Sequence, residues 1–517
     1  MSFAKVYSAH TILLDAQIIT VEVDIIVKSL QAFTIVGLPD KAVEESRDRV
    51  SAAIGNSDLP SPKKQNSKVI VSLAPADVKK EGPSFDLAIA LAYLLAYKDP
   101  DTGERVTTFD PTGKIFLGEL SLDGKLRRIT GVLPLVIEAK KRGFTDVFLP
   151  KENTLEAALI DGINVYGAET LNDVIDHLND EKKFTITKSP KTKISTRKAK
   201  KTGIEFDDIK GNSTAKRGLL IAAAGGHNIA LYGPPGTGKT MLARAFTGIL
   251  PPLSFDDALE VTGIHSIAGK LKTGLILEPP FRSPHHTSSY VAIIGGGVNP
   301  KPGEVTLAHK GVLFLDEFPE FDRRVVETLR QPLEDAYVSI SRAKGSAEFP
   351  ARFILVASMN PCPCGNRGSK KECICTPMNI ERYKRKLSGP IVDRIDMWIE
   401  VSKVEYKDLS ERTERTGEGD KLRKEVEKAH AIAQKRFEKY PHIKTNGQMN
   451  ARNLLEIVEL SPEVKKILNE AAEKHNMSAR GYHRTIKLAR TIADIEGSLE
   501  IKSDNILEAL QYRYKEM

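Results

Sequence analysis

Eight consecutive residues have the types and spacing of a nucleotide-phosphate loop. They read Gly-Pro-Pro-Gly-Thr-Gly-Lys-Thr and fit G-x-x-x-x-G-K-[ST] at every fixed position. Glycines let backbone N–H groups surround phosphate oxygens, and a helix that begins there adds partial positive charge. We expect Lys239 to reach the β- and γ-phosphates and Thr240 to bind Mg²⁺. The predicted nucleotide-binding residues are Gly233, Pro234, Pro235, Gly236, Thr237, Gly238, Lys239 and Thr240.

Two adjacent acids follow a second apolar run. Gly311–Leu315 is continuously apolar and leads into Asp316 and Glu317. A strand with this sequence delivers both carboxylates to the carboxyl edge of a parallel sheet, where such sheets bind ligands. We expect Asp316 to hold Mg²⁺ through water and Glu317 to act as the general base for an attacking water. ATP and Mg²⁺ are therefore the predicted cofactors.

A polar residue follows the next apolar run. Arg352–Ala357 continues into Ser358, Met359 and Asn360. An amide at this strand end can orient the attacking water or contact the γ-phosphate. The alternative is that Asn360 only closes a turn before Pro361. Its place beside the other two motifs favours a catalytic role.

All four cysteines of the chain lie within a short segment, at Cys362, Cys364, Cys373 and Cys375. Four thiolates can form a closed tetrahedral Zn²⁺ site, which is structural because no coordination position stays open. The gaps of one residue differ from the usual C-x-x-C, so unliganded thiols and a redox pair are the alternatives. The clustering disfavours a secreted fold stapled by disulfides.

The apolar runs around these residues predict a parallel sheet with helices on both faces. Asn228–Tyr232, Gly311–Leu315 and Arg352–Ala357 are typical of short buried strands, and a helix is expected over Met241–Gly248. Further helices are predicted over Lys421–Lys439, Ser461–His475 and Arg480–Ser498. The N-terminal part mixes strands (Ile18–Val27, Lys68–Leu73, Thr145–Leu149) with helices (Pro83–Ala96, capped by Ser84, and Leu133–Arg142).

The composition is that of an ordinary globular protein. The chain has 517 residues, 41% hydrophobic and 28% charged, which suggests about three domains and excludes a mostly disordered chain. The longest apolar run, around Leu87–Tyr97, is too short to cross a bilayer, and the first residues lack signal-peptide features. We therefore expect a cytoplasmic protein with no membrane partner. The net charge of +8 comes mainly from Lys182–Lys201, which is either a solvated tether or a phosphate-binding segment.

The phosphate loop, the acid pair and Asn360 together resemble the AAA+ ATPases, and Phe206–Gly211 looks like the segment that packs over adenine in that superfamily. The strings FRSPHHT, GGGVNPKPGEVTLAHKGVLFLDE, LRQPLEDAYVSISRA and MNPCPCG closely resemble magnesium-chelatase-like ATPases, specifically the YifB/ComM competence-protein family. The resemblance covers nearly the whole chain. It implies an AAA+ P-loop NTPase core of α/β class with an α-helical lid.

The resemblance also assigns several basic residues. Arg394, in the segment Gly-Pro-Ile-Val-Asp-Arg-Ile-Asp, is expected to be the arginine finger that enters a neighbour's ATP site; its alternative is an ion pair with Asp393 or Asp396. Arg480 is expected to be the sensor-2 arginine of the lid, with Arg484 as the competing candidate. Inserts of this family face the pore of a ring, so Arg342 and Lys344 are candidate DNA contacts, with hairpin-surface charges as the alternative.

Two adjacent histidines, His285 and His286, could suggest a metal. We instead expect loop structure or polar contacts at these positions, because the pair follows a proline.

The N-terminal part resembles the Lon protease domain. Lys79–Leu87 looks like its serine box, with the serine at Ser84, and the runs from Phe116 to Gly124 and from Val147 to Asn153 resemble its second half. Lon uses a Ser–Lys dyad, and the resemblance places the lysine at Leu133. Phe85 and Asp86 replace the small residues after the serine. We therefore expect an α+β, Lon-protease-like domain without protease activity.

Together these features predict four regions: residues 1–181, Lon-like; 182–203, a basic flexible linker; 204–400, the ATPase core with its inserts and the cluster of four cysteines; and 401–517, the helical lid. The implied function is ATP-driven work on single-stranded or branched DNA by a homo-oligomeric ring, a hexamer, resembling the branch-migration helicases of natural transformation. One alternative is a chelatase-type motor that inserts Mg²⁺ into a tetrapyrrole. An ATP-dependent protease is disfavoured because of Leu133.

Overall fold

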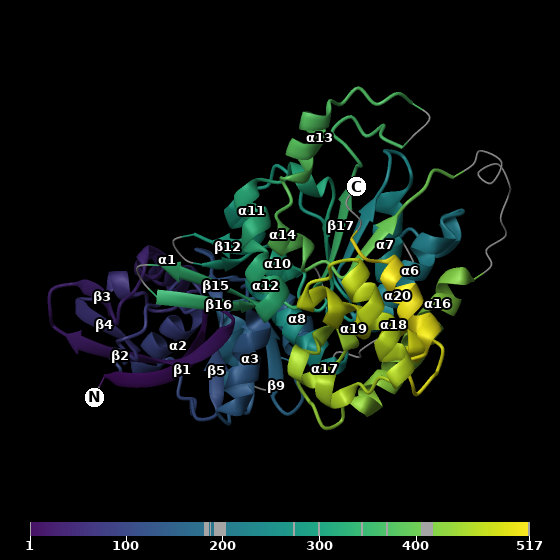
Figure 1. Cartoon of the computed structure of the whole chain (residues 1–517). Helices are drawn as coiled ribbons and strands as arrows, with labels where there is room; N and C mark the ends of the chain where they lie inside the picture. The colour runs from purple at the N-terminus through teal and green to yellow at the C-terminus, as the bar shows by residue number, and fades with distance from the viewer. Residues whose placement is uncertain are drawn as a thin grey trace. The chain divides into compact units, whose positions relative to one another are not determined.

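The structure is a computed structural model (Figure 1), and it describes residues 2–179, 186, 188–190, 203–271, 274–297, 300–342, 345–368, 371–404 and 417–514. The chain forms two compact units, and neither is a single continuous stretch. The first consists of Met1–Arg197 together with Leu259–Leu275, and the second of Lys198–Ala258 together with Ile276–Met517. Most of the expected basic linker, Lys182–Lys201, lies outside the described residues.

The first unit begins with a four-stranded sheet in the order β1-β2-β4-β3. Its elements are β1 (Phe3–Ile12), β2 (Asp15–Val27), β3 (Ala32–Val36), β4 (Ser67–Ala74), α1 (Lys41–Asn56) and α2 (Asp86–Ala96). Residues of β4 alternate between buried and half-buried, as expected for a strand with one face on a core. Every residue of α2 is buried, which explains its almost continuous apolar sequence. The expected cap of this helix is wrong, because α2 begins at Asp86 and no side chain caps it.

The second half of this unit is a three-stranded parallel sheet with helices. Its elements are β5 (Lys114–Phe116), β6 (Glu119–Leu120), β7 (Leu126–Arg127), α3 (Val132–Lys141), β8 (Asp146–Pro150), α4 (Thr154–Ala157), β9 (Asn164–Ala168) and α5 (Leu171–Leu178). The segment Leu259–Leu275 joins it, and both of its end residues pack against the core of this sheet. Within the segment, the Ser266 hydroxyl donates a hydrogen bond to the buried Glu156 carboxylate. The unit is thus an α+β domain completed by a distant part of the chain.

The second unit is built on a five-stranded parallel sheet in the order β11-β14-β17-β10-β18. The strands are β10 (Ile229–Tyr232), β11 (Phe281–Arg282), β14 (Val312–Leu315), β17 (Ile354–Met359) and β18 (Met397–Glu400). All four residues of β14 are buried, as expected for a strand covered on both faces. The helices α6 (Ser213–Gly225) and α7 (Lys239–Ile249) contribute to the same core. The predicted α/β P-loop NTPase core is confirmed.

Along the chain, further elements lie between the strands of this sheet. They are α8 (Phe255–Ile267), α9 (Tyr290–Ile294), β12 (Gly295–Gly296), β13 (Lys301–Pro302), α10 (Glu304–Leu307), α11 (Arg323–Thr328), α12 (Arg330–Asp335), β15 (Tyr337–Arg342), β16 (Gly345–Pro350), α13 (Pro377–Lys384) and α14 (Gly389–Val392). The part of α8 from Leu259 onward belongs to the first unit. The predicted hairpin is present, since β15 and β16 pair antiparallel. Lys344 lies outside the described residues, and the Arg342 side chain is not described.

The C-terminal region is helical and belongs to the same compact unit as the sheet. It contains α16 (Glu418–Arg436), α17 (Ala451–Ile457), α18 (Pro462–Lys474), α19 (Ala479–Ile495) and α20 (Ser503–Gln511). The three longest helices correspond to the predicted ones, and Ser461 and Ser478 cap two of them through their side chains. The two shorter helices, α17 and α20, were not expected from the apolar pattern.

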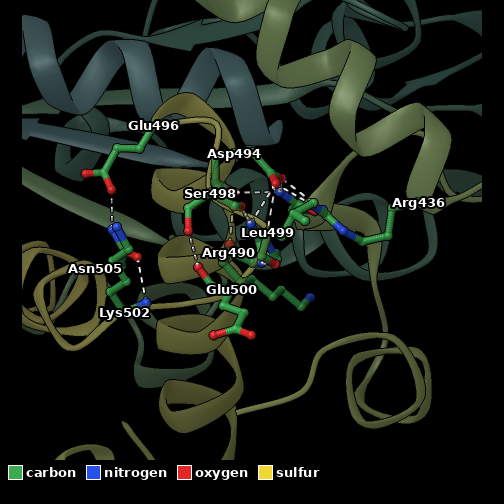
Figure 2. A network of polar contacts seen from close by, with 12 residues as sticks. Arg436, Arg490, Asp494, Glu496, Ser498, Leu499, Glu500, Lys502 and Asn505 are labelled. Carbon is green, nitrogen blue, oxygen red and sulfur yellow. Dashed lines mark hydrogen bonds and ion pairs between the residues drawn. The ribbon is translucent and has the colours of Figure 1, made fainter. Parts of the chain in front are cut away.

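A buried charge network holds these helices together (Figure 2). The Asp494 side chain, 1% exposed, accepts hydrogen bonds from Arg436 (2.9 Å), Arg490 (3.2 Å) and Asn446 (2.8 Å). Arg490 also donates to the carbonyls of Ser498 and Leu499, which closes the end of α19. The Asp494 carboxylate therefore ties α16 to α19, and Arg490 ties α19 to the turn that follows it.

Candidate nucleotide site

The phosphate loop occupies the turn between β10 and α7, at the carboxyl edge of the sheet. Gly236 and Gly238 adopt φ of +75° and +89°, a left-handed conformation that favours glycine. Lys239 is folded back across the loop. Its Nζ donates to the carbonyls of Gly233 (2.7 Å) and Pro234 (2.9 Å). The two carbonyl oxygens hold the Lys239 ammonium group inside the loop. We expect the phosphate oxygens of a bound nucleotide to replace them as its hydrogen-bond acceptors.

Lys239 also contacts the predicted sensor residue. Its Nζ donates to Asn360 Oδ1 at 3.2 Å, and Asn360 directly follows β17. Burial lowers the pKa of Lys239, while the carboxylates of Asp316 and Glu317 oppose that shift. The structure therefore brings the loop lysine, the acid pair and the sensor amide to one place.

Asp316 lies at the centre of a cluster of oxygen atoms. Thr240 Oγ1 donates to Asp316 Oδ2 at 3.0 Å. The hydroxyl of Ser358, on the neighbouring strand, donates to the other carboxylate oxygen. A hydroxyl and a carboxylate are the hard oxygen ligands that suit Mg²⁺, so Thr240 and Asp316 fit the ion that accompanies ATP. When bound, Mg²⁺ neutralises phosphate charge.

Glu317 adopts a strained backbone conformation at the end of β14. Its φ is +52°, which is uncommon for a residue with a side chain and clusters at functional sites. The side chain is 54% exposed, and its Oε2 lies 3.3 Å from Nδ1 of His286. The histidine pair thus makes polar contacts, since His285 in turn bonds Thr287 at 2.8 Å. An exposed carboxylate beside Asp316 is in position to accept a proton from water.

The four cysteine sulfurs are gathered at the loop that follows Asn360. The Sγ–Sγ distances are 3.4 Å for Cys362–Cys364 and 3.7 Å from each of these to Cys373. All four ligand atoms, including that of Cys375, lie within 4.8 Å of one another. A tetrahedron of thiolates at the usual Zn–S bond length has edges of about 3.8 Å. The donor set and its spacing therefore fit Zn²⁺.

The three predicted arginines lie at the opposite end of the sheet. Arg394 precedes β18, which runs parallel to β10, and its carbonyl accepts a hydrogen bond from Asn228 at the start of β10. The phosphate loop follows the end of β10. At ~3.3 Å per residue, the four residues of β10 separate the two edges by about 13 Å.

Glu334 joins two of these arginines. Arg394 pairs with one of its carboxylate oxygens and Arg480 donates to the other at 3.0 Å. The sequence had suggested that Arg394 would form an ion pair with Asp393 or Asp396. In the structure its ion pair is with Glu334 instead. Arg484 instead donates to the carbonyls of Asp393 and Ile395, both at 2.7 Å.

A cleft of about 1310 Å³ opens at this amino edge of the sheet. Arg394, Arg480 and Arg484 are among its lining residues, together with parts of α16 and α19. The phosphate loop is not part of its lining, so the cleft is separate from the chain's own nucleotide site.

Comparisons with known proteins match nearly the whole chain. The family described as magnesium chelatase, subunit ChlI, matches residues 205–409; subunit ChlI of Mg-chelatase matches 21–153, and its C-terminal family matches 417–513. The chain is 40% identical over 515 residues to competence protein ComM of Haemophilus influenzae, covering 99% of this chain and 98% of that protein. It is 39% identical over 515 residues to YifB of Escherichia coli, covering 99% and 97%.

The chain belongs to the YifB/ComM family of magnesium-chelatase-like AAA+ ATPases. It is therefore an ATPase, and membership of this family implies that it uses ATP with Mg²⁺. A shorter stretch of 98 residues, 19% of the chain, is 35% identical to 21% of DNA repair protein RadA of Streptococcus pneumoniae. None of the helices within the described ranges is long and apolar enough to span a bilayer.

Two residues at which the predicted Lon-like domain departs from the protease pattern, Leu133 and Asp86, lie in the core of the first unit. Leu133 is fully buried, and its N–H donates to Glu156 Oε1 at 2.9 Å. Asp86 is also buried and accepts hydrogen bonds from Arg49 (2.9 Å) and the Leu120 N–H (3.2 Å). Burial raises the pKa of Asp86, and Arg49 opposes the shift. Both side chains therefore have packing roles in this domain, and its lack of protease activity stays a prediction.

The contacts of three residues of the site were not anticipated, although polar contacts of some kind had been expected at His286. Ser358 had a readable signal, because residues two apart on a strand share a face and Asn360 was already a candidate. His286 and Glu334 had none, since each contacts its partner only through the tertiary fold.

Proposed function

We propose that this ATPase assembles into a homo-oligomeric ring and uses ATP hydrolysis to move branch points in DNA. The observation that carries the ring is the separation of Arg394 and Arg480 from the phosphate loop of their own chain. Guanidinium groups at the amino edge of the sheet cannot reach a nucleotide bound at the carboxyl edge. A neighbouring subunit is therefore needed to complete each hydrolysis site.

Glu334 supports this interpretation of the two arginines. Its carboxylate holds both guanidinium groups in the isolated chain. A γ-phosphate carries more charge and more acceptor oxygens than one carboxylate, so a neighbour's nucleotide can replace Glu334 as the shared partner. On this proposal Arg394 stabilises developing phosphate charge and Arg480 senses the same phosphate, both in trans. A hexamer is the ring size we propose.

The DNA part of the proposal rests on the relatives. The full-length similarity is to a protein named for competence, and the shorter one is to a protein named for DNA repair. Lys344 and most of the linker 182–203 lie outside the described residues, so these and Arg342 stay predicted DNA contacts. Contacts of lysine and arginine with phosphates make affinity fall steeply with salt and depend little on base sequence.

Two further assignments complete the proposal. The cluster of four cysteines holds one structural Zn²⁺ per chain, and the protein works in the cytoplasm, where a reducing environment keeps the thiols available as ligands.

The test is a strand-exchange assay with a synthetic four-way or three-stranded DNA junction and ATP. We expect the wild-type protein to convert the junction into products and Glu317→Gln to bind it without conversion. A wild-type protein that hydrolyses ATP but neither binds nor moves single-stranded or branched DNA at low salt would refute the DNA assignment. A motor that supports insertion of Mg²⁺ into a tetrapyrrole would then be the better proposal, and magnesium insertion with partner subunits would be measured.

A further inference from the structure

The cysteine loop and the phosphate loop are in direct contact. Gly365 lies between the two cysteine pairs, and a Cβ placed on it would be 2.8 Å from Cδ and 3.1 Å from Cγ of Pro235. Pro235 is the third residue of the phosphate loop. Real Cβ atoms essentially never approach another atom to within 3.0 Å, so the backbone at Gly365 lies closer to the phosphate loop than any side chain allows.

The same loop is tied to the sensor residue. Cys362 is fully buried only two residues after Asn360, and the Gly365 N–H donates to the Cys362 carbonyl at 2.9 Å, which closes a tight turn. Asn360 accepts a hydrogen bond from Lys239. Just before it, the carbonyl of Met359 accepts one from the Gly233 N–H at 3.2 Å. Both ends of the phosphate loop therefore contact the residues that lead into the cysteine turn.

A metal at the four sulfurs would make this arrangement rigid. Thiols 3.4 to 3.7 Å apart make only weak contacts with one another. Four Zn–S bonds instead fix the relative positions of Cys362, Cys364, Cys373 and Cys375, and structural Zn²⁺ sites contribute folding free energy directly.

We infer that Zn²⁺ bound by the four cysteines acts as a clamp that holds Gly365 against Pro235 and Asn360 beside Lys239, so that zinc occupancy sets the affinity of the site for ATP. The inference rests on the ATPase activity and on the zinc site proposed above. It does not depend on what the motor moves.

Two glycines of the same loop provide a matched test. Gly365 and Gly368 have nearly equal φ, +77° and +76°, so alanine meets the same backbone penalty at both. The Cβ of Gly365→Ala would collide with Pro235, whereas no described atom beyond the adjacent residues of the chain lies within 4 Å of the Cβ of Gly368→Ala. Relieving that collision requires the phosphate loop or the cysteine loop to shift from the arrangement described above. We expect Gly365→Ala to weaken binding of a fluorescent ATP analogue about tenfold, and Gly368→Ala to change it by less than about twofold.

The zinc content of the full-length protein is measured in the same samples. We expect about one Zn²⁺ per chain in the wild type and in both variants. Stripping the wild type with a chelator should weaken ATP binding as Gly365→Ala does, and reloading with Zn²⁺ should restore it. The clamp is overturned if stripped protein or Gly365→Ala binds the analogue as tightly as the wild type, or if purified wild type contains no zinc. A wild type that binds no nucleotide at all would instead contradict the ATPase assignment.

Discussion

Replacement of Asp494 by alanine is expected to destabilise the ATPase unit strongly. The carboxylate faces two guanidinium groups with little access to water, since the Arg490 side chain is 5% exposed and that of Arg436 is 16% exposed. Burial lowers the pKa of Arg490, and the Asp494 charge opposes that shift. Removing one member of a buried ion pair costs ~3–5 kcal/mol, because an uncompensated charge stays buried. Asp494→Ala should therefore lower the free energy of unfolding by about that amount.

The chain offers a selective probe for this measurement. Trp398 is its single tryptophan and lies on β18, so tryptophan fluorescence follows unfolding of the second unit alone. With a slope of about 3 kcal/mol per molar urea, the expected loss moves the urea midpoint down by about 1–2 M.

The control is Asp504→Ala, which removes an exposed acid from the first turn of α20. Among the described residues that carboxylate makes no ion pair, so the variant removes mainly its interaction with the helix dipole, worth less than ~1 kcal/mol. If Asp494→Ala and Asp504→Ala shift the midpoint equally, the buried pair does not stabilise the unit.

Three further variants test the predicted roles of single residues. Glu317→Gln should keep ATP binding and lose turnover, because an amide cannot accept the proton of the attacking water; turnover at the wild-type rate would show that another group is the base. Arg394→Ala should cut hydrolysis by roughly 10³-fold, and mixing it with Lys239→Ala should restore part of the activity in mixed rings, whereas no recovery would argue against a role in trans. Ser84→Ala should change no activity, and loss of a peptide-cleaving activity would revive the protease alternative.

The nucleotide site could be predicted from the sequence because its signals are local. The phosphate loop is eight consecutive residues, and Asp316, Glu317 and Asn360 each follow an apolar strand at the sheet's carboxyl edge. Strand ends of a parallel sheet meet at one edge, so the motif order sufficed to bring them together. By contrast, the prediction that Ser84 caps a helix failed, because the helix starts later, at Asp86. The Asp86 side chain binds Arg49 of α1, a contact that the local sequence does not show.

The placement of the arginines could not be predicted in the same way. Their distance from the phosphate loop depends on β18 pairing beside β10, which are far apart in sequence and related only by the strand order. Glu334, on α12, became their partner through tertiary packing, in place of the two acids that the sequence suggested. The family resemblance predicted nucleotide-sensing roles for Arg394 and Arg480, but it did not predict that both lie away from the phosphate loop of their own chain.

The segment Leu259–Leu275 has a consequence for how the molecule can be cut. It leaves the ATPase unit and returns to it, yet it packs in the N-terminal unit, where Ser266 bonds Glu156 and Arg128 donates to the Leu271 carbonyl at 3.1 Å. A protease that nicks the chain between residues 182 and 203 would therefore release nothing, because the larger fragment still carries a piece of the smaller one's core. An expression clone that stops before residue 204 would lack that piece and leave the packing sites of Leu259 and Leu275 open to water. For the same reason, gene fusion or recombination at the linker cannot exchange the N-terminal domain as an independent module.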